Sequence, residues 1–272
     1  MPRKSSAEPQ PRERRRWFHY SVRVLVVGGV IAGSLYAFQQ AEQFLLRDPR
    51  FTVTPPDYGL ESPSLHVDGI RYASRAQVLR AFAPDFGRSL YEVPLGERRE
   101  QLRRLDWVRD ASIARIWPNR LLVRIEEREP IAFLQLPNQG PLSEFALIDR
   151  DGVILAPPKH GSFKLPVVVG IRPDSPAAKR RDSVRRLLRL MSDIGPLGDR
   201  VSEVDVTDPD NLKVTSRVDN RAMALMLGDH NFAQRLQNFV NHYAQIQQRL
   251  PGATTLDLRL EDRITVVEGK SE

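Results

Sequence analysis

The chain has 272 residues, of which 41 are lysine or arginine and 34 are aspartate or glutamate, so its formal net charge is +7. The absence of cysteine excludes disulfides, zinc–thiolate sites and thiol nucleophiles. Residues 1–23 carry seven basic and two acidic side chains, a net charge of +5, which leaves only +2 for the other 249 residues. This distribution argues against a nucleic-acid-binding protein, because the basic excess lies at one end of the chain.

The first predicted element is a transmembrane helix over residues 17–39, preceded by a basic arm over residues 1–16 that we expect to be disordered. No charged residue lies between Arg23 and Glu42. The uncharged run alone is short for a hydrocarbon layer of about 30 Å, and an extension back to Trp17 supplies the missing length. The chain is therefore predicted to cross a membrane once.

The arginines of the N-terminal arm predict the orientation of this helix. Positive charge flanking a span stays in the cytoplasm, so the rest of the chain is expected to be extracytoplasmic, anchored in the inner membrane. A cleaved signal peptide has a similar layout, with residues 32–34 as a candidate cleavage site. The bulky side chains of Leu35, Tyr36 and Phe38 continue the apolar run past that site, which favours an uncleaved anchor.

Residues 40–64 are predicted to be an extended connector. Four prolines, at positions 49, 55, 56 and 63, interrupt this stretch. Proline lacks a backbone N–H and clashes with a preceding helical turn, so we expect a tether rather than a helix here.

Residues 65–129 are predicted to form a first compact unit with the order β-α-α-β-β. Its expected elements are a strand at 65–70, a helix from Ser74 to residue 82, a helix at 95–105, and antiparallel strands at 107–117 and 121–126. On the second helix Leu95, Leu102 and Leu105 are expected to face inward, and Glu97, Arg98, Arg99, Arg103 and Arg104 outward. Trp107 and Trp117 could form a binding face, but packing in the core of this first unit is favoured for both.

Residues 130–267 are predicted to form a second unit, followed by a tail at 268–272. Strands are expected at 131–134, 145–148, 153–155, 201–206, 212–215, 222–227, 255–260 and 264–267, and helices around 184–194 and 232–250. Residues 165–169 form another apolar run. The run Asp149-Arg150-Asp151-Gly152 indicates a hairpin, because Asp-Gly tolerates positive φ. The expected fold class is α+β, with a mainly antiparallel sheet and covering helices.

No catalytic, cofactor-binding or metal-binding residues are predicted, and no small-molecule substrate is expected. The five histidines lack metal-ligand spacing, and the chain has no nucleophile elbow, phosphate-cradling loop or dinucleotide fingerprint. Neighbouring acids such as Glu126 and Glu127 are typical of a solvated surface. The chain is therefore not expected to be an enzyme, although a buried Asp/Glu/His cluster in a pocket of the second unit would favour an envelope enzyme.

The C-terminal segment Ile264-Thr265-Val266-Val267 is short, apolar and close to the end of the chain. At a sheet edge its unpaired backbone groups could accept a strand from a partner. A central strand paired on both sides, or an edge protected by the tail, fits the same residues. The sequence alone leaves these alternatives open.

Four stretches, in this order, carry a family resemblance: residues 67–70, 87–95, 105–119 and 123–133. Together, after a basic arm and one span, they resemble the FtsQ/DivIB family of bitopic bacterial cell division proteins. The resemblance implies that residues 65–129 form a POTRA (polypeptide-transport-associated) domain and residues 130–267 the family's β-domain. It also implies a non-enzymatic scaffold in the septal division complex, or divisome, with FtsB-like and FtsL-like division proteins as partners.

The resemblance further implies a partner-binding site at the last strands, which in the family receive a strand from FtsB by sheet extension. The matching residues are Leu256, Asp257, Leu258, Arg259, Leu260, Arg263, Ile264, Thr265, Val266 and Val267. POTRA units also occur in envelope secretion or assembly components, which is the alternative function. That alternative requires a long run of lipid-facing strands, and residues 130–272 are too few and too helical for it.

Overall fold

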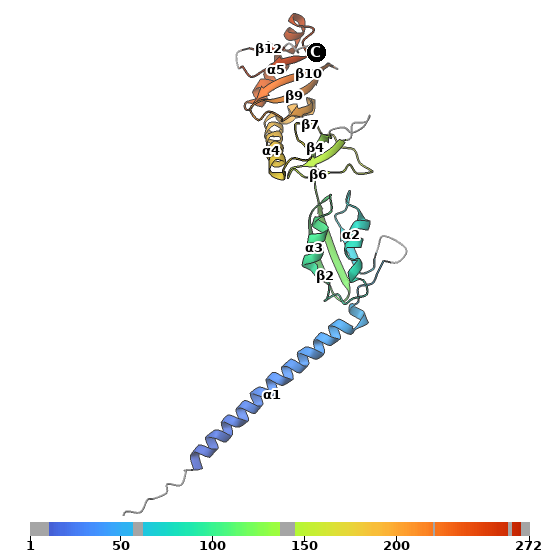
Figure 1. Ribbon diagram of the computed structural model, residues 1–272, viewed down its shortest axis with the longest axis vertical. Helices are drawn as coiled ribbons and strands as arrows, with labels where there is room; N and C mark the ends of the chain where they lie inside the picture. The colour runs from blue at the N-terminus through green and yellow to red at the C-terminus, as the bar shows by residue number, and fades with distance from the viewer. Residues whose placement is uncertain (1–10, 57–61, 137–144, 220, 261–262, 268–272) are drawn as a thin grey trace, which may run out of the picture. The chain divides into compact units, whose positions relative to one another are not determined.

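A computed structural model describes residues 11–56, 62–136, 145–219, 221–260 and 263–267, with side chains from Val22 onward (Figure 1). Of the predicted segments, residues 1–10 of the arm, residues 57–61 of the connector and the tail at 268–272 lie outside the described residues. The chain divides into two compact units. The first comprises residues 1–68, 75–102 and 111–125, and the second comprises residues 69–74, 103–110 and 126–272.

A single long helix, α1 (Pro11–Arg47), contains the apolar run. Its part Val22–Arg47 is long and apolar enough to cross a membrane. The predictions of disorder at residues 11–16 and of an extended chain at residues 40–47 are wrong, because α1 includes both stretches. Proline is tolerated in the first helical turn, and residues 39–46 are mostly good helix formers, so the first true stop comes at Pro49.

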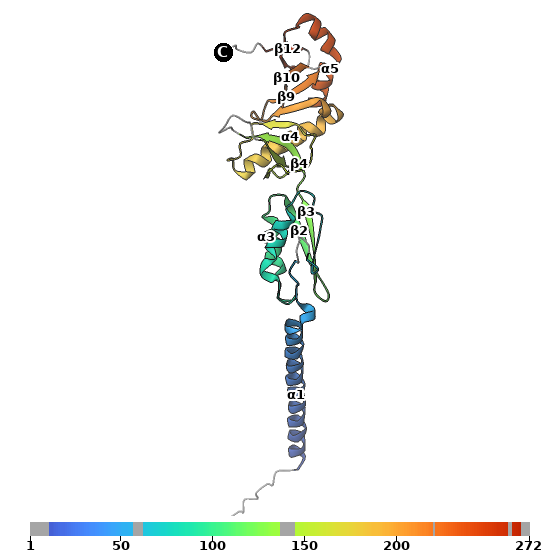
Figure 2. The same cartoon turned by 90° about the vertical axis from the view of Figure 1, so that its right-hand side faces the viewer.

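The predicted β-α-α-β-β order is confirmed in the first sheet. Its elements are the short helix η1 (Pro49–Phe51), β1 (Leu65–Asp68), α2 (Arg75–Ala81), η2 (Ala83–Asp85), α3 (Leu95–Arg103), β2 (Val108–Ile116) and β3 (Arg120–Glu127). The strand order is β1-β3-β2, with β1 parallel to β3. Figure 2 shows α3 beside one face of β2 and β3. Val78, Phe82 and Leu102 from the helices are fully buried, as are Leu121 and Val123 from β3.

The prediction that Arg98 faces solvent is wrong. Its side chain is buried, and its guanidinium donates to the carboxylate of fully buried Asp85, with Nε–Oδ2 at 2.5 Å and Nη2–Oδ1 at 2.9 Å. Two parallel bonds to a carboxylate satisfy a buried guanidinium and fix its geometry. Helical periodicity places Arg98 on the solvent-facing side of α3. The sequence of α3 alone cannot reveal its partner, because the carboxylate of Asp85 belongs to η2.

Trp107 and Trp117 have different environments, and the prediction that both pack in the core of the first unit is wrong: Trp107 is buried among residues of the second unit, and Trp117 is exposed. Trp107 is buried, donates from Nε1 to the carbonyl oxygen of Ala156 at 3.1 Å, and lies 4.9 Å from the ring of Tyr72 between centroids. Trp117 is 69% exposed. It lies in the turn between β2 and β3, where no sheet face covers it.

The second sheet has nine strands in the order β12-β11-β10-β9-β8-β7-β4-β5-β6. The strands are β4 (Pro130–Gln135), β5 (Phe145–Asp149), β6 (Ile154–Leu155), β7 (Val167–Val169), β8 (Val201–Asp205), β9 (Leu212–Val218), β10 (Arg221–Gly228), β11 (Thr255–Asp257) and β12 (Thr265–Val266). Five of the eight pairings are antiparallel, so the expected mainly antiparallel sheet is confirmed. The predicted hairpin joins β5 to β6, with Gly152 at φ +74°.

The helices α4 (Ala177–Ile194) and α5 (Phe232–Arg249) share one hydrophobic core with this sheet, and η3 (Gly195–Arg200) follows α4. Leu187 and Leu190 of α4 and Leu236 and Phe239 of α5 are fully buried in that core. The helical apolar faces predicted from the sequence therefore cover the sheet that holds the C-terminal strands.

The buried pair Asp85–Arg98 provides a test of the first unit's stability. We expect Asp85→Ala to lower the free energy of unfolding by about 3–5 kcal/mol, because it leaves a buried guanidinium without its carboxylate. Urea denaturation of the detergent-solubilised chain, followed by circular dichroism, measures the change. Arg104→Ala, at an exposed position just after α3, is the matched control and should change stability by less than about 0.5 kcal/mol. Equal effects of the two variants would contradict a stabilising buried pair.

Candidate partner-binding edge

The C-terminal strand β12 is the terminal strand of the nine-stranded sheet. It pairs antiparallel with β11, with Leu256 opposite Val266 and Asp257 opposite Thr265. The amide of Val267 donates to the carbonyl oxygen of Thr255 at 3.1 Å. Within the part of the chain that the structure describes, no strand pairs with the other side of β12. Figures 1 and 2 show β9, β10 and β12 following one another toward this end of the sheet.

The hydrogen-bonding pattern assigns a direction to the backbone groups of β12. In an antiparallel ladder, successive residues direct their N–H and C=O groups alternately toward and away from the paired strand. Because Val267 bonds inward to Thr255, the N–H and C=O of Val266 point away from β11. Val266 therefore presents both backbone groups at the open side of the sheet.

The predicted site residues divide into buried and accessible groups. Leu256 and Leu258 are in the core, with 0% and 2% exposure, and pack β11 in place. The accessible or half-buried members are Asp257, Arg259, Leu260, Arg263, Ile264, Thr265, Val266 and Val267. The structure thus brings eight of the ten predicted residues to the surface at one sheet end and places the other two beneath them.

Arg235 of α5 holds this region together. Its Nη1 donates to the carbonyl oxygen of Leu227 at 2.5 Å, and its Nη2 donates to the carbonyl oxygen of Arg259 at 3.0 Å. Arg235 itself is buried. One guanidinium therefore connects a helix to the end of β10 and to the segment after β11. The sequence analysis did not identify Arg235 as a site residue. The sequence feature that could have indicated it is a basic residue next to Leu236, on the helix face predicted to cover the sheet.

Asp257 and Arg259 form a second local restraint. Arg259 donates from Nε to Asp257 Oδ1 at 2.9 Å and from Nη2 to Oδ2 at 2.5 Å. These bonds hold the pKa of the Asp257 carboxyl below its ordinary value. A lowered folded-state pKa stabilises the fold above the ordinary carboxyl pKa, and that contribution is lost as the pH falls through the folded-state value. The pair therefore restrains the segment after β11 at neutral pH.

A groove of about 440 Å³ lies between α5 and the C-terminal segment. Leu258, Leu260 and Ile264 supply its apolar wall, and Asn238 and His242 of α5 supply polar groups on the opposite wall. The groove lies directly beside β12, so a strand added to this edge could place a side chain in it. Among the described residues, no group of three or more His, Asp or Glu side chains is arranged to hold a metal ion.

The bonds of Arg235 yield a test of how the edge is held. We expect Arg235→Met to raise amide hydrogen exchange at Leu258 and Val267 by roughly an order of magnitude, because two charge-assisted bonds are lost. Gln248→Ala changes an exposed residue of the same helix and is the matched control. Unchanged protection of both amides in the Arg235→Met variant would contradict the role assigned to this arginine.

Comparisons with known proteins agree with this architecture. Residues 138–259 match the family model described as cell division protein FtsQ/DivIB, C-terminal, and residues 63–128 match that of the POTRA domain, FtsQ-type. The cell division protein FtsQ of Koribacter versatilis is 32% identical over 209 residues, which cover 75% of this chain and 59% of the relative. The FtsQ of Rhodothermus marinus is 28% identical over 213 residues, covering 75% of this chain and 76% of the relative.

The matched part of the chain thus spans less than two thirds of the Koribacter relative. The two family models cover most of the two sheets in the same order, while β4 and β12 lie outside residues 138–259. The fold is accordingly an N-terminal apolar helix, a POTRA domain and a mostly antiparallel sheet domain with helices. The chain belongs to the FtsQ/DivIB family of cell division proteins.

Proposed function

We propose that this chain is a non-enzymatic scaffold of the divisome that binds a partner division protein by adding a strand to β12. The single observation that carries the proposal is the position of β12 at the end of the sheet, with no described strand on its outer side. Main-chain bonds from Val266 would supply affinity, because they pair a backbone edge that otherwise faces water. The groove beside Leu260 and Ile264 would select the side chains of the added strand.

The partners in this proposal are FtsB-like and FtsL-like division proteins, with the FtsB-like protein supplying the strand. Family membership implies a role in cell division and supports this choice of partner. Arg259 at this edge already pairs with Asp257. Selection of the added strand is therefore assigned to the apolar wall of the groove, so a strand that places an apolar side chain there fits this edge.

The proposed location is the inner membrane at the division septum, with the N-terminus in the cytoplasm and both sheets outside it. The apolar part of α1 supports a single-pass anchor. The arginines before it support the orientation, because positively charged flanks remain cytoplasmic. The anchor would confine the scaffold to the membrane surface where its partners are held.

The strand-addition proposal is tested by a proline at the outward-facing position. Val266→Pro removes the N–H that points away from β11, so the β11–β12 ladder keeps its own bonds while the outer edge loses a donor. We expect at least a tenfold loss of affinity for an immobilised peptide with the strand-forming segment of an FtsB-like protein, measured by surface plasmon resonance.

Two variants serve as controls for this measurement. Val266→Ala retains the backbone donor and should bind within about threefold of the unmodified chain. Ile264→Pro removes a second backbone donor at this edge and should weaken binding as Val266→Pro does. Capture of the peptide at full strength by both proline variants would overturn the edge as the binding site.

The orientation is tested by single cysteines, since the chain has none of its own. We expect a membrane-impermeant maleimide to label Lys159→Cys in intact spheroplasts, because that exposed position lies in the second unit. Ser6→Cys should be labelled only after lysis. The reverse labelling pattern would contradict the proposed topology.

A further inference from the structure

Three accessible aromatic rings surround one buried ring in the first unit. Phe51 is 2% exposed, and the ring centroids of Phe44, Tyr91 and Trp117 lie 5.8, 5.7 and 5.8 Å from its own. These outer rings are 50%, 38% and 69% exposed, respectively. We call the four residues the juxtamembrane aromatic cluster. A partly solvated group of this size marks an interaction surface rather than a core.

Hydrogen bonds to backbone carbonyl oxygens fix this cluster to the end of α1. Ser89 Oγ donates to the carbonyl oxygen of Leu45 in α1 at 2.8 Å, and the amide of Leu90 donates to the carbonyl oxygen of Phe51 at 2.7 Å. Arg115 of β2 then donates to the carbonyl oxygens of Leu90, Tyr91 and Val93. The rings of Tyr91 and Trp117 are therefore held beside the C-terminal end of α1.

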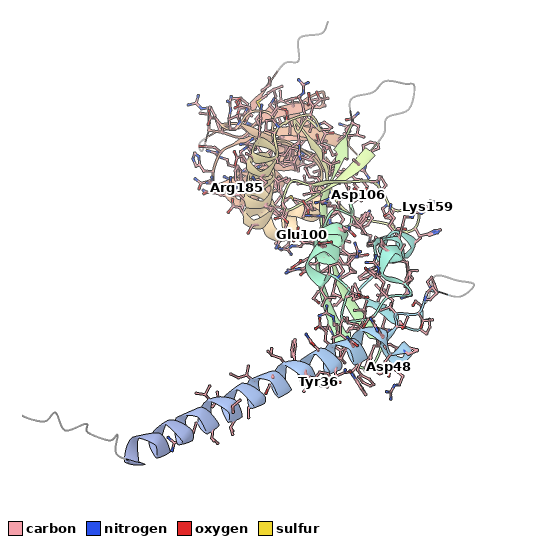
Figure 3. The ribbon with its side chains drawn as sticks, turned by 60° about the horizontal axis from the view of Figure 1, so that its bottom comes forward. Tyr36, Asp48, Glu100, Asp106, Lys159 and Arg185 are labelled. Carbon is pink, nitrogen blue, oxygen red and sulfur yellow. The ribbon has the colours of Figure 1, made fainter. Side chains whose placement is uncertain are left out.

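Distance along α1 sets the depth of this cluster. A hydrocarbon layer of about 30 Å takes about 20 helical residues. The predicted span of residues 17–39 ends five residues before Phe44, which is about 7.5 Å along the helix. The headgroup layer outside the hydrocarbon is about 5–8 Å thick on each side. Figure 3 shows Tyr36 within the helix and Asp48 at its C-terminal end. The aromatic rings thus lie at the level where a bilayer passes from hydrocarbon to headgroups.

The arginine side chains around the cluster are suited to the headgroup layer of a bilayer. Arg47, Arg50, Arg88 and Arg120 are exposed at this end of the unit. The guanidinium of Arg50 lies 5.4 Å from the centroid of the Phe44 ring and pairs with Asp48. Aromatic rings interleaved with arginine are typical of membrane interfaces, because the rings enter the headgroup layer while the arginines meet lipid phosphates.

We propose that Phe44, Tyr91 and Trp117 insert into the headgroup layer of the membrane that α1 crosses, so that the POTRA domain rests on lipid. This inference rests on the membrane anchoring in the proposed function. The occupant is a phospholipid surface with anionic headgroups, argued from the continuity of the cluster with the candidate span and from the surrounding arginines. Docking of this kind would restrict how the POTRA domain swings about the end of α1.

Tryptophan fluorescence of the full chain in phosphatidylcholine–phosphatidylglycerol vesicles tests the proposal. In the Trp17→Phe, Trp107→Phe variant only Trp117 emits, and we expect lipids brominated near the headgroup to quench it by at least half. In the Trp107→Phe, Trp117→Phe variant only Trp17 emits, and its quenching reports insertion of α1. In the Trp17→Phe, Trp117→Phe variant only Trp107 emits, and this buried ring should not be quenched.

These variants separate failure of the inference from failure of the anchor. Quenching of Trp17 without quenching of Trp117 overturns lipid docking and leaves the anchor intact. Absence of quenching for both overturns the anchor and the docking together. Shielding of Trp117 by an added protein partner, with no quenching by lipid, assigns the cluster to that protein and also overturns the proposal.

A second measurement keeps all three tryptophans in place. Ile116 is 44% exposed beside Trp117, so a nitroxide on Ile116→Cys samples the same depth. We expect its accessibility to oxygen, relative to a water-soluble nickel complex, to be several-fold higher than for a nitroxide on Lys159→Cys. Equal ratios at the two positions would overturn lipid docking.

Discussion

One buried guanidinium holds the end of the sheet on which the proposed function depends. Arg235 donates to the carbonyl oxygens of Leu227 and Arg259, which belong to the end of β10 and to the segment after β11. Arg235 is buried, and leaving a buried donor without a partner costs about 1–3 kcal/mol, so these bonds restrain both segments. Gly228 leaves room for this side chain, because it has no Cβ. A Cβ at this position would lie only 2.7 Å from Arg235 Nη1. A glycine at φ +73° thus makes room for the arginine that positions the edge.

Within the described residues, β12 is a short strand with a neighbouring strand on one side only. Thr265 and Val266 form the whole strand, and two residue pairs supply little free energy against the cost of ordering the chain. The half-buried side chains of Ile264 and Val266 add contacts with the core. A strand added on the outer side would pair the remaining backbone groups, so partner binding and ordering of the C-terminal segment would reinforce each other.

Sequence periodicity predicts the fold correctly wherever the residues of a single helix or strand determine which of its side chains are buried. The apolar faces of α4 and α5, the hairpin at Asp149–Gly152 and the β-α-α-β-β order all depend on spacing within a few residues. Arg98 and Arg235 show where this reasoning ends. Each is a buried cation whose partner, a carboxylate or a carbonyl, comes from another element and cannot be read from the helix itself. The predicted helix was shorter than α1 at its C-terminal end. The prolines from position 49 onward predicted an extended connector, although residues 40–47 before them are mostly good helix formers.

The candidate site was predicted from family resemblance, and the structure adds which of its residues are buried and which are accessible. The resemblance assigned Leu256 and Leu258 to the same site as Arg259 and Leu260. All four residues lie within the strand predicted at 255–260. Side-chain alternation places the first two in the core and leaves the backbone edge to β12. The outward groups of Val266 depend on ladder register, which the bond from Val267 to Thr255 determines and which a sequence of four apolar residues does not contain.

The two proposed contact surfaces belong to different compact units. The juxtamembrane aromatic cluster lies within the first unit, and β12 lies within the second. Each is held by bonds internal to its own unit, through Ser89 and Arg115 in one case and Arg235 in the other. A substitution at one surface therefore leaves the contacts of the other intact. If lipid docking nevertheless altered partner affinity, we would expect the coupling to act through restricted motion of the POTRA domain, because the side-chain bonds named above each lie within one unit.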